Sequence, residues 1–189
     1  TSNNNPGASD YCESGSAQNW TGTLKIISYS GTWSGTTFSL SATRVISTAE
    51  TYNIASNSSC LAKGGSPNVN KREDHRFQGV AAAPDSLSVY TAIGSVIGSP
   101  SRCGFFWYQV QGSDGTVLQH ASVSDTKLEY YFPEVVVDNA GNLIIGVTRS
   151  AGDSDTSPEW SSAYLFHRIS TDASNTLRTP LLAYAGTAH

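Results

Sequence analysis

Three short segments of the chain combine aromatic rings with carboxylates, an imidazole and guanidinium groups, a set of groups that can recognise a sugar. Aromatic rings stack on sugar faces, and paired polar groups bind the hydroxyls. The predicted ligand-binding residues are Asp74, His75, Arg76, Tyr130, Tyr131, Glu134, Arg149 and Trp160. The simpler interpretation is structural, because Tyr131 can pack between sheets and both arginines can tie segments together through carboxylates.

The same segments supply the residue types of a sialidase-like glycoside hydrolase, in which a tyrosine nucleophile is helped by a glutamate. The candidates are Glu129, Tyr130, Tyr131 and Glu134. However, the Ser-x-Asp-x-Gly-x-x-Trp box of sialidases does not occur. The histidines at 75, 120, 167 and 189 could serve a Ser-His-Asp triad, yet no Gly-x-Ser-x-Gly elbow is present. The sequence assigns no catalytic residue and favours binding over catalysis.

Metal and cofactor sites have little support in the sequence. The stretch from Asp153 to Glu159 offers the oxygen ligands that calcium prefers, at Asp153 and Asp155. It lacks the regular acidic spacing of a calcium loop, and so a solvated loop is the simpler interpretation. No histidine and cysteine stand at the spacing of zinc ligands. We expect no cofactor and no other metal, with calcium near Asp153 and Asp155 as the alternative.

The composition indicates the kind of protein that positions these residues. Only 14% of the residues are charged, whereas Gly, Ser, Thr and Asn are plentiful, which is typical of loop-rich, all-β, extracellular proteins. The net charge of -4 gives no basic field for nucleic acid. No apolar run reaches the length of a membrane helix. The start at Thr1 resembles a processed secreted protein.

Three cysteines, at 12, 60 and 103, allow one disulfide and leave one thiol over. We expect Cys60 and Cys103 to pair, because both precede strands at the same rim of one sheet. Cys12 also precedes a strand in the neighbouring unit, so its pairing stays an alternative. Sequons occur at Asn19 and Asn57, although the sequence does not show whether either is glycosylated.

Apolar alternation predicts strands almost everywhere, and no amphipathic helix of ten residues or more is evident. Two hairpins recur. "VAAAPDSLSVYTA" (80–92) matches "VVVDNAGNLIIGVT" (135–148), and "FWYQVQGSDGTVLQHA" (106–121) matches "LFHRISTDASNTLRTP" (165–180). A four-stranded unit that recurs in this way predicts antiparallel β-propeller-type blades, with a β-sandwich as the alternative.

These segments resemble a group of secreted bacterial β-propeller proteins that are distantly sialidase-like in architecture. The resemblance covers about 70–189 and rests on four elements: Asp74-x-Arg76-Phe77, Tyr131-Phe132-Pro133, the turn Asp138-x-x-Gly141, and Ser162-Ala163-Tyr164. It implies a fold and an extracellular location more than a reaction, because most such proteins have no assigned activity. An Arg-Trp-Gly-Asp-Tyr element usually follows the last strand in that group, and this chain stops before it.

The sequence therefore predicts an irregular segment (1–22), a half blade (23–47), a connecting loop (48–76) and two blades (77–123 and 124–189). Two and a half blades cannot close a ring. We therefore expect either that the chain is a fragment of a longer polypeptide or that other copies or another chain complete the fold. The predicted function is a secreted binding or assembly module for a glycan or an extracellular protein. The alternatives are a hydrolase whose site is completed outside this chain, and a structural subunit of an extracellular assembly.

Overall fold

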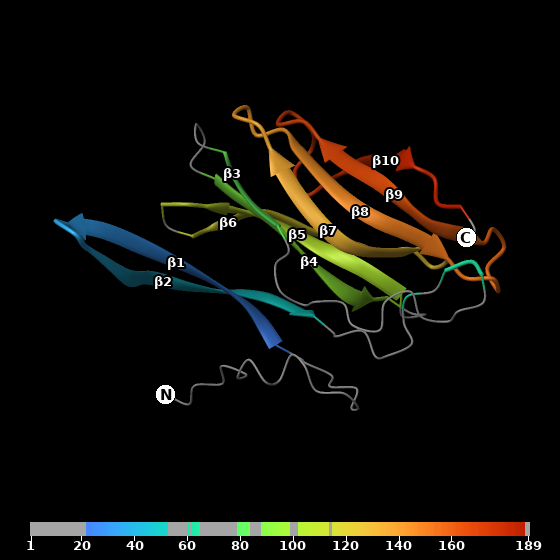
Figure 1. The fold of residues 1–189 in the computed structure, drawn as a ribbon, viewed down its shortest axis with the longest axis horizontal. Helices are drawn as coiled ribbons and strands as arrows, with labels where there is room; N and C mark the ends of the chain where they lie inside the picture. The colour runs from blue at the N-terminus through green and yellow to red at the C-terminus, as the bar shows by residue number, and fades with distance from the viewer. Residues whose placement is uncertain are drawn as a thin grey trace.

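The structure is a computed structural model, and it describes residues 22–52, 60, 62–64, 79–83, 88–98, 102–113 and 115–187. Within 22–52 the side chains are described only for 34–37. The described residues form ten strands and no helix (Figure 1). Their bounds are β1 Gly22–Ser34, β2 Thr37–Tyr52, β3 Gly79–Ala83, β4 Ser88–Ile97, β5 Arg102–Gln111, β6 Val117–Val123, β7 Glu129–Val137, β8 Leu143–Ala151, β9 Glu159–Arg168 and β10 Arg178–Tyr184.

The strands form three antiparallel sheets, each built from strands that follow one another in the chain. The first sheet has the order β3-β4-β5-β6, the second has β10-β9-β8-β7, and β1 pairs only with β2. Sequential antiparallel strands need only short turns, which explains why Gly, Asn and Asp lie between the apolar runs. The all-β prediction is confirmed.

The hairpin between β7 and β8 illustrates how local sequence sets these turns. The N–H group of Gly141 donates to the carbonyl of Asp138 at 3.0 Å, and φ of Gly141 is 78°. The Asp138 carboxylate accepts the backbone N–H of Asn142 at 2.8 Å and its side-chain amide at 2.7 Å. Glycine takes this left-handed conformation without a Cβ clash. The turn from Asp138 to Gly141 that the sequence predicted is confirmed, and its tight geometry depends on the positive φ of Gly141.

The main core lies between the first and second sheets, which pack against each other (Figure 1). The ring of Phe105 on β5 meets that of Phe166 on β9 at 5.3 Å between centroids and that of Tyr130 on β7 at 6.5 Å, both edge to face. The buried residues of this core are Ala83, Tyr90, Ala92, Phe105, Trp107, Tyr130, Val135, Leu143, Ile145, Val147, Tyr164 and Phe166. Burial of so many aromatic rings supplies most of the hydrophobic stabilisation between the sheets.

The first sheet is also packed on its opposite side. Ile93, Tyr108 and Val110 form a second buried cluster there, with Phe106 and Val117 packed against it. Residues of β2 approach β4 as well. β2 continues to Tyr52, five residues beyond the predicted end of the half blade at 47. The first sheet therefore carries buried apolar residues on both faces.

Candidate functional site

The predicted ligand-binding residues fall into two groups in the structure. Asp74, His75 and Arg76 lie outside the described residues, as does Cys12. Tyr130 and Arg149 are partners across β7 and β8 at one end of the second sheet, and Tyr131 is the partner of Thr148 at the same end. The register therefore brings together side chains that lie well apart in the sequence.

Arg149 is held by a carboxylate and an aromatic ring. Its Nη2 donates to Glu159 Oε2 at 2.7 Å, and its Nε donates to the same oxygen at 3.1 Å. The guanidinium carbon stands 3.5 Å from the centroid of the Tyr164 ring, and Nη2 also donates to the Tyr164 hydroxyl. Burial raises the pKa of Tyr164, while the positive charge of Arg149 opposes that change. These contacts favour the structural interpretation of Arg149, as a tie between β8 and β9.

The two tyrosines of β7 are buried, with 6% of Tyr130 and 1% of Tyr131 exposed. Burial raises the pKa of Tyr130, with the negative charge of Asp125 adding to the effect. The Tyr131 hydroxyl lies 2.8 Å from Ser161 Oγ and donates to Ser150 Oγ at 3.3 Å. Little of either ring is left for a ligand or a substrate, which agrees with packing between the sheets.

Trp160 stands at the same end of the sheet, next to a short segment from the connection between β2 and β3. A Cβ atom placed on Gly64 would come 2.4 Å from the Trp160 ring. The N–H of Gly64 donates to Asp153 Oδ1 at 3.0 Å, and the N–H of Lys63 donates to the carbonyl of Glu159 at 3.1 Å. Glycine is required at position 64 because φ is 104° and the ring leaves no room for a side chain. This segment therefore covers part of the Trp160 surface.

The predicted calcium ligands are engaged by N–H donors. Asp155 accepts Arg102 Nη2 at 2.9 Å through one oxygen and the N–H of Gly152 at 2.8 Å through the other. Asp153 accepts the N–H of Gly64. Both carboxylates therefore already accept hydrogen bonds, and calcium binding at Asp153 and Asp155 stays a prediction.

A buried ion pair, which the sequence analysis did not predict, joins the two sheets near this end of the second sheet. Glu129 on β7 is completely buried, and its Oε1 accepts Arg102 Nη1 of β5 at 2.8 Å. Its Oε2 accepts the N–H of Cys103 at 2.6 Å. The hydrogen bond that Arg102 donates to Glu129 raises the pKa of Arg102. Neither the spacing nor the surroundings of these residues in the sequence indicated that they would meet.

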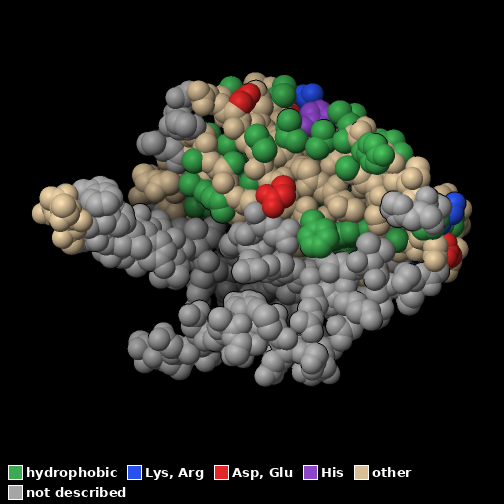
Figure 2. Space-filling view, in the orientation of Figure 1, with side chains coloured by type: hydrophobic (Ala, Val, Ile, Leu, Met, Phe, Trp, Pro, Cys, Tyr) green, Lys and Arg blue, Asp and Glu red, His purple; other side chains and the backbone are tan. Residues whose placement is uncertain are grey.

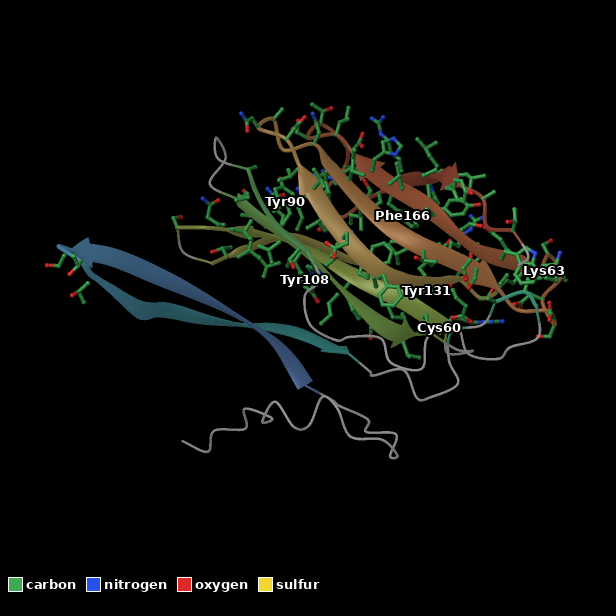
Figure 3. The ribbon with its side chains drawn as sticks, viewed as in Figure 1. Cys60, Lys63, Tyr90, Tyr108, Tyr131 and Phe166 are labelled. Carbon is green, nitrogen blue, oxygen red and sulfur yellow. A yellow bond between two sulfur atoms is a disulfide. The ribbon has the colours of Figure 1, made fainter. Side chains whose placement is uncertain are left out.

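The expected disulfide between Cys60 and Cys103 is confirmed, with a Cα–Cα distance of 5.5 Å. Tyr131 packs against it, as Figure 3 shows beside Cys60. The Glu129 carboxylate lies with the two sulfur atoms in a group whose ligand atoms are all within 4.8 Å of one another. Because the thiolate is the form of cysteine that binds metals, the bonded sulfurs provide no metal site.

The second sheet exposes an apolar surface on the side away from the first sheet. We call this surface the outer face. It carries Val136 (65% exposed), Ile144 (45%), Leu165 (36%), Leu181 (58%) and Tyr184 (73%). Figure 2 shows hydrophobic side chains gathered over this part of the molecule. Glu134 alternates onto this side of β7, but its carboxylate reaches back to β3, since a Cβ atom on Gly79 would lie 2.7 Å from Glu134 Oε2.

The register places these apolar side chains in neighbouring rows across the four strands of the second sheet. Val136 pairs with Ile144, whose row continues to His167 and Arg178. Leu181 pairs with Leu165, whose row continues through Gly146 to Glu134, and Tyr184 pairs with Ala163. Paired residues of an antiparallel sheet project to the same side, so these side chains form adjoining rows. Exposed apolar surfaces of this kind mark interaction sites in soluble proteins.

Comparisons of the chain with models of protein families, with curated proteins and with solved structures find no match. They neither support nor contradict the resemblance to secreted propeller proteins. Within the described ranges, no helix has the length and apolar character needed to cross a membrane.

Proposed function

We propose that this chain is a secreted binding and assembly module that contacts another protein through the outer face of its second sheet. The single observation that carries the proposal is the exposure of apolar side chains from β7, β8, β9 and β10 on the same face of the second sheet. Apolar groups in contact with water are stabilised by about 25 cal/mol for each Å² that a partner covers. The buried disulfide is compatible with an extracellular location.

The two four-stranded sheets stand, under this proposal, for two propeller-type blades. Each is antiparallel and built from sequential strands, and their facing sides share one core. Support for the alternative functions is weaker. Glycan binding is less favoured because Tyr130 and Tyr131 are buried and Arg149 is paired with Glu159. Catalysis by a tyrosine nucleophile is less favoured because neither tyrosine ring is exposed to a substrate.

The test is the mass of the chain in solution as a function of concentration, measured by sedimentation. The parent chain should associate above its monomer mass of 20.0 kDa as the concentration rises. The double variant Val136→Glu/Leu181→Glu should stay monomeric, because burial of unpaired carboxylates at an interface is costly.

The matched control is Val80→Glu, a residue of β3 in the first sheet that is 67% exposed. It adds one negative charge, half the charge that the double variant adds, to a strand outside the outer face, and it should associate like the parent chain. A parent chain that is monomeric at every concentration, or three chains that behave alike, would contradict the proposal.

A further inference from the structure

The internal repeat aligns residues of the outer face with residues on one face of the first sheet, the face that the second sheet covers. The alignment of 80–92 with 135–148 places Ala81 with Val136 before the turn. After the one-residue difference in the turn, it places Tyr90 with Gly146 and Ala92 with Thr148. Val136, Gly146 and Thr148 belong to the outer face, since they alternate with the buried Val135, Ile145 and Val147.

In the first sheet, the equivalent residues are covered by the second sheet. Tyr90 and Ala92 are buried in the core between the sheets, and Ala81 packs against it. The residues equivalent to Ile145 and Val147 are Val89 and Thr91, which alternate with Tyr90 and Ala92 and so lie on the side away from the second sheet. The two sheets are thus stacked in the same sense, head to tail, rather than with equivalent faces towards each other.

Head-to-tail stacking is open, because each added layer presents again the face that the previous layer has covered. In this chain the second sheet covers such a face of the first sheet and exposes its own. A third sheet stacked in the same way would cover the outer face of the second sheet. The residues that it places there would resemble the residues of the second sheet that face the first sheet. Those residues are β-branched and aromatic: Val135, Ile145, Val147, Tyr164 and Phe166.

The shape of the apolar surface also selects a sheet as the partner. Its residues come from all four strands, Val136 at one edge and Leu181 and Tyr184 at the other. A helix would cover a stripe of such a surface, whereas a second sheet packs over its full width at about 10 Å.

Pairing along the edge of the second sheet is a poorer alternative. The edge strands are β10 and β7, which contain Pro180 and Pro133, and neither proline has an N–H group to donate. The register of β10 with β9 is also irregular between Arg178 and Leu181. Features of this kind protect edge strands against the addition of another strand.

We infer that the occupant of the outer face is another antiparallel four-stranded β-sheet of the same repeat type, stacked head to tail on β7–β10. This inference rests on the proposed function, and it specifies the partner as a sheet with an inner face of β-branched and aromatic residues. Its stacking order follows that of the first two sheets.

The experiment extends the full chain, in a Cys12→Ser background, with a flexible Gly/Ser linker and a second copy of residues 124–189. Ile144→Cys in the original second sheet reports on the outer face through its rate of reaction with a thiol reagent. This cysteine should react at least about tenfold more slowly in the extended chain than in the unextended one, because the reaction then requires the added sheet to open. A cysteine placed instead at the corresponding position of the added copy should react at the unextended rate.

A control extension carries Ile145→Asp and Phe166→Asp in the added copy, which puts charge on its inner face only. Protection of Ile144→Cys should disappear. Unchanged reactivity in the unmodified extension, whether or not the added copy folds, overturns the inference, as does protection that survives the two aspartates. If the unextended chain still associates through Val136 and Leu181 in either case, the proposed function stands and only the sheet partner is wrong.

Discussion

Arg102 of β5 and Glu129 of β7 form an ion pair with 2.8 Å between Nη1 and Oε1, and this pair links the first sheet to the second. The same guanidinium group binds Asp155 between β8 and β9 at 2.9 Å. Arg102 therefore connects β5 to β7 and to the loop between β8 and β9. Because Glu129 is completely buried, its charge depends on these partners rather than on water.

Removal of the charged Arg102 side chain should be strongly destabilising. Arg102→Met leaves the buried Glu129 carboxylate without its counter-ion, and we expect a loss of about 3–5 kcal/mol in the free energy of unfolding. Adding Glu129→Gln should recover part of this loss, because the neutral amide still accepts the N–H of Cys103. Urea denaturation measures both changes. The exposed pair of Arg178 and Asp172 supplies the control, since Arg178→Met should change stability far less. Equal losses in the two arginine variants would refute the role of burial.

Gly141 should not tolerate a side chain. Gly141→Ala must hold φ at 78°, and its Cβ would lie 3.2 Å from the Tyr90 hydroxyl. We expect a loss of about 1 kcal/mol or more in thermal or urea denaturation. Gly146→Ala is the matched control on the adjoining strand, because its Cβ would meet only Leu165 Cδ2, at 3.8 Å. A smaller loss at 141 than at 146 would contradict the turn argument.

The disulfide should contribute through the loop that it closes. Cys60 and Cys103 are separated by 43 positions, for which the chain-entropy model gives about 4 kcal/mol. Cys60→Ala/Cys103→Ala should lose a stabilisation of this size, and treatment of the parent chain with a reductant should lower the denaturation midpoint in the same direction. Cys12→Ala is the control and should leave the midpoint unchanged. Peptide mapping that links Cys12 to either residue would overturn the assignment.

Acid should weaken the contact between Asp172 and Arg178. The hydrogen bond from Arg178, together with that from the N–H of Ile169, lowers the pKa of Asp172 from 3.8 to about 2. A depressed pKa in the folded state stabilises the protein above pH 3.8, and this contribution is lost as the pH falls towards 2. The difference in urea midpoint between the parent chain and Asp172→Asn should therefore be present above pH 3.8 and vanish near pH 2. A difference that is constant across this range would contradict it.

The internal repeat was only partly predictable from the sequence. The hairpins at 80–92 and 135–148 occupy equivalent strands in the two sheets. Aligned residues of the two hairpins project to equivalent sides of their sheets. The second alignment, of 106–121 with 165–180, is displaced: Tyr108 pairs with Thr91 and Tyr164 pairs with Val147, so Tyr108 corresponds to Tyr164 rather than to His167. Short apolar runs look alike at several offsets, and only the hydrogen-bonded register distinguishes them.

Local rules determined the strands, the Asp138–Gly141 turn and the all-β class, because these depend on alternation and on backbone freedom at single residues. The sequence also nominated the Cys60–Cys103 bond. Only the tertiary structure decided that Arg149 meets Glu159 and Tyr164, that Arg102 meets Glu129, and that the apolar residues of β7 to β10 share one exposed face. Such contacts join side chains from different strands, and their distances depend on strand register and on the stacking of whole sheets. The residue types alone do not predict the strand register or the stacking of the sheets.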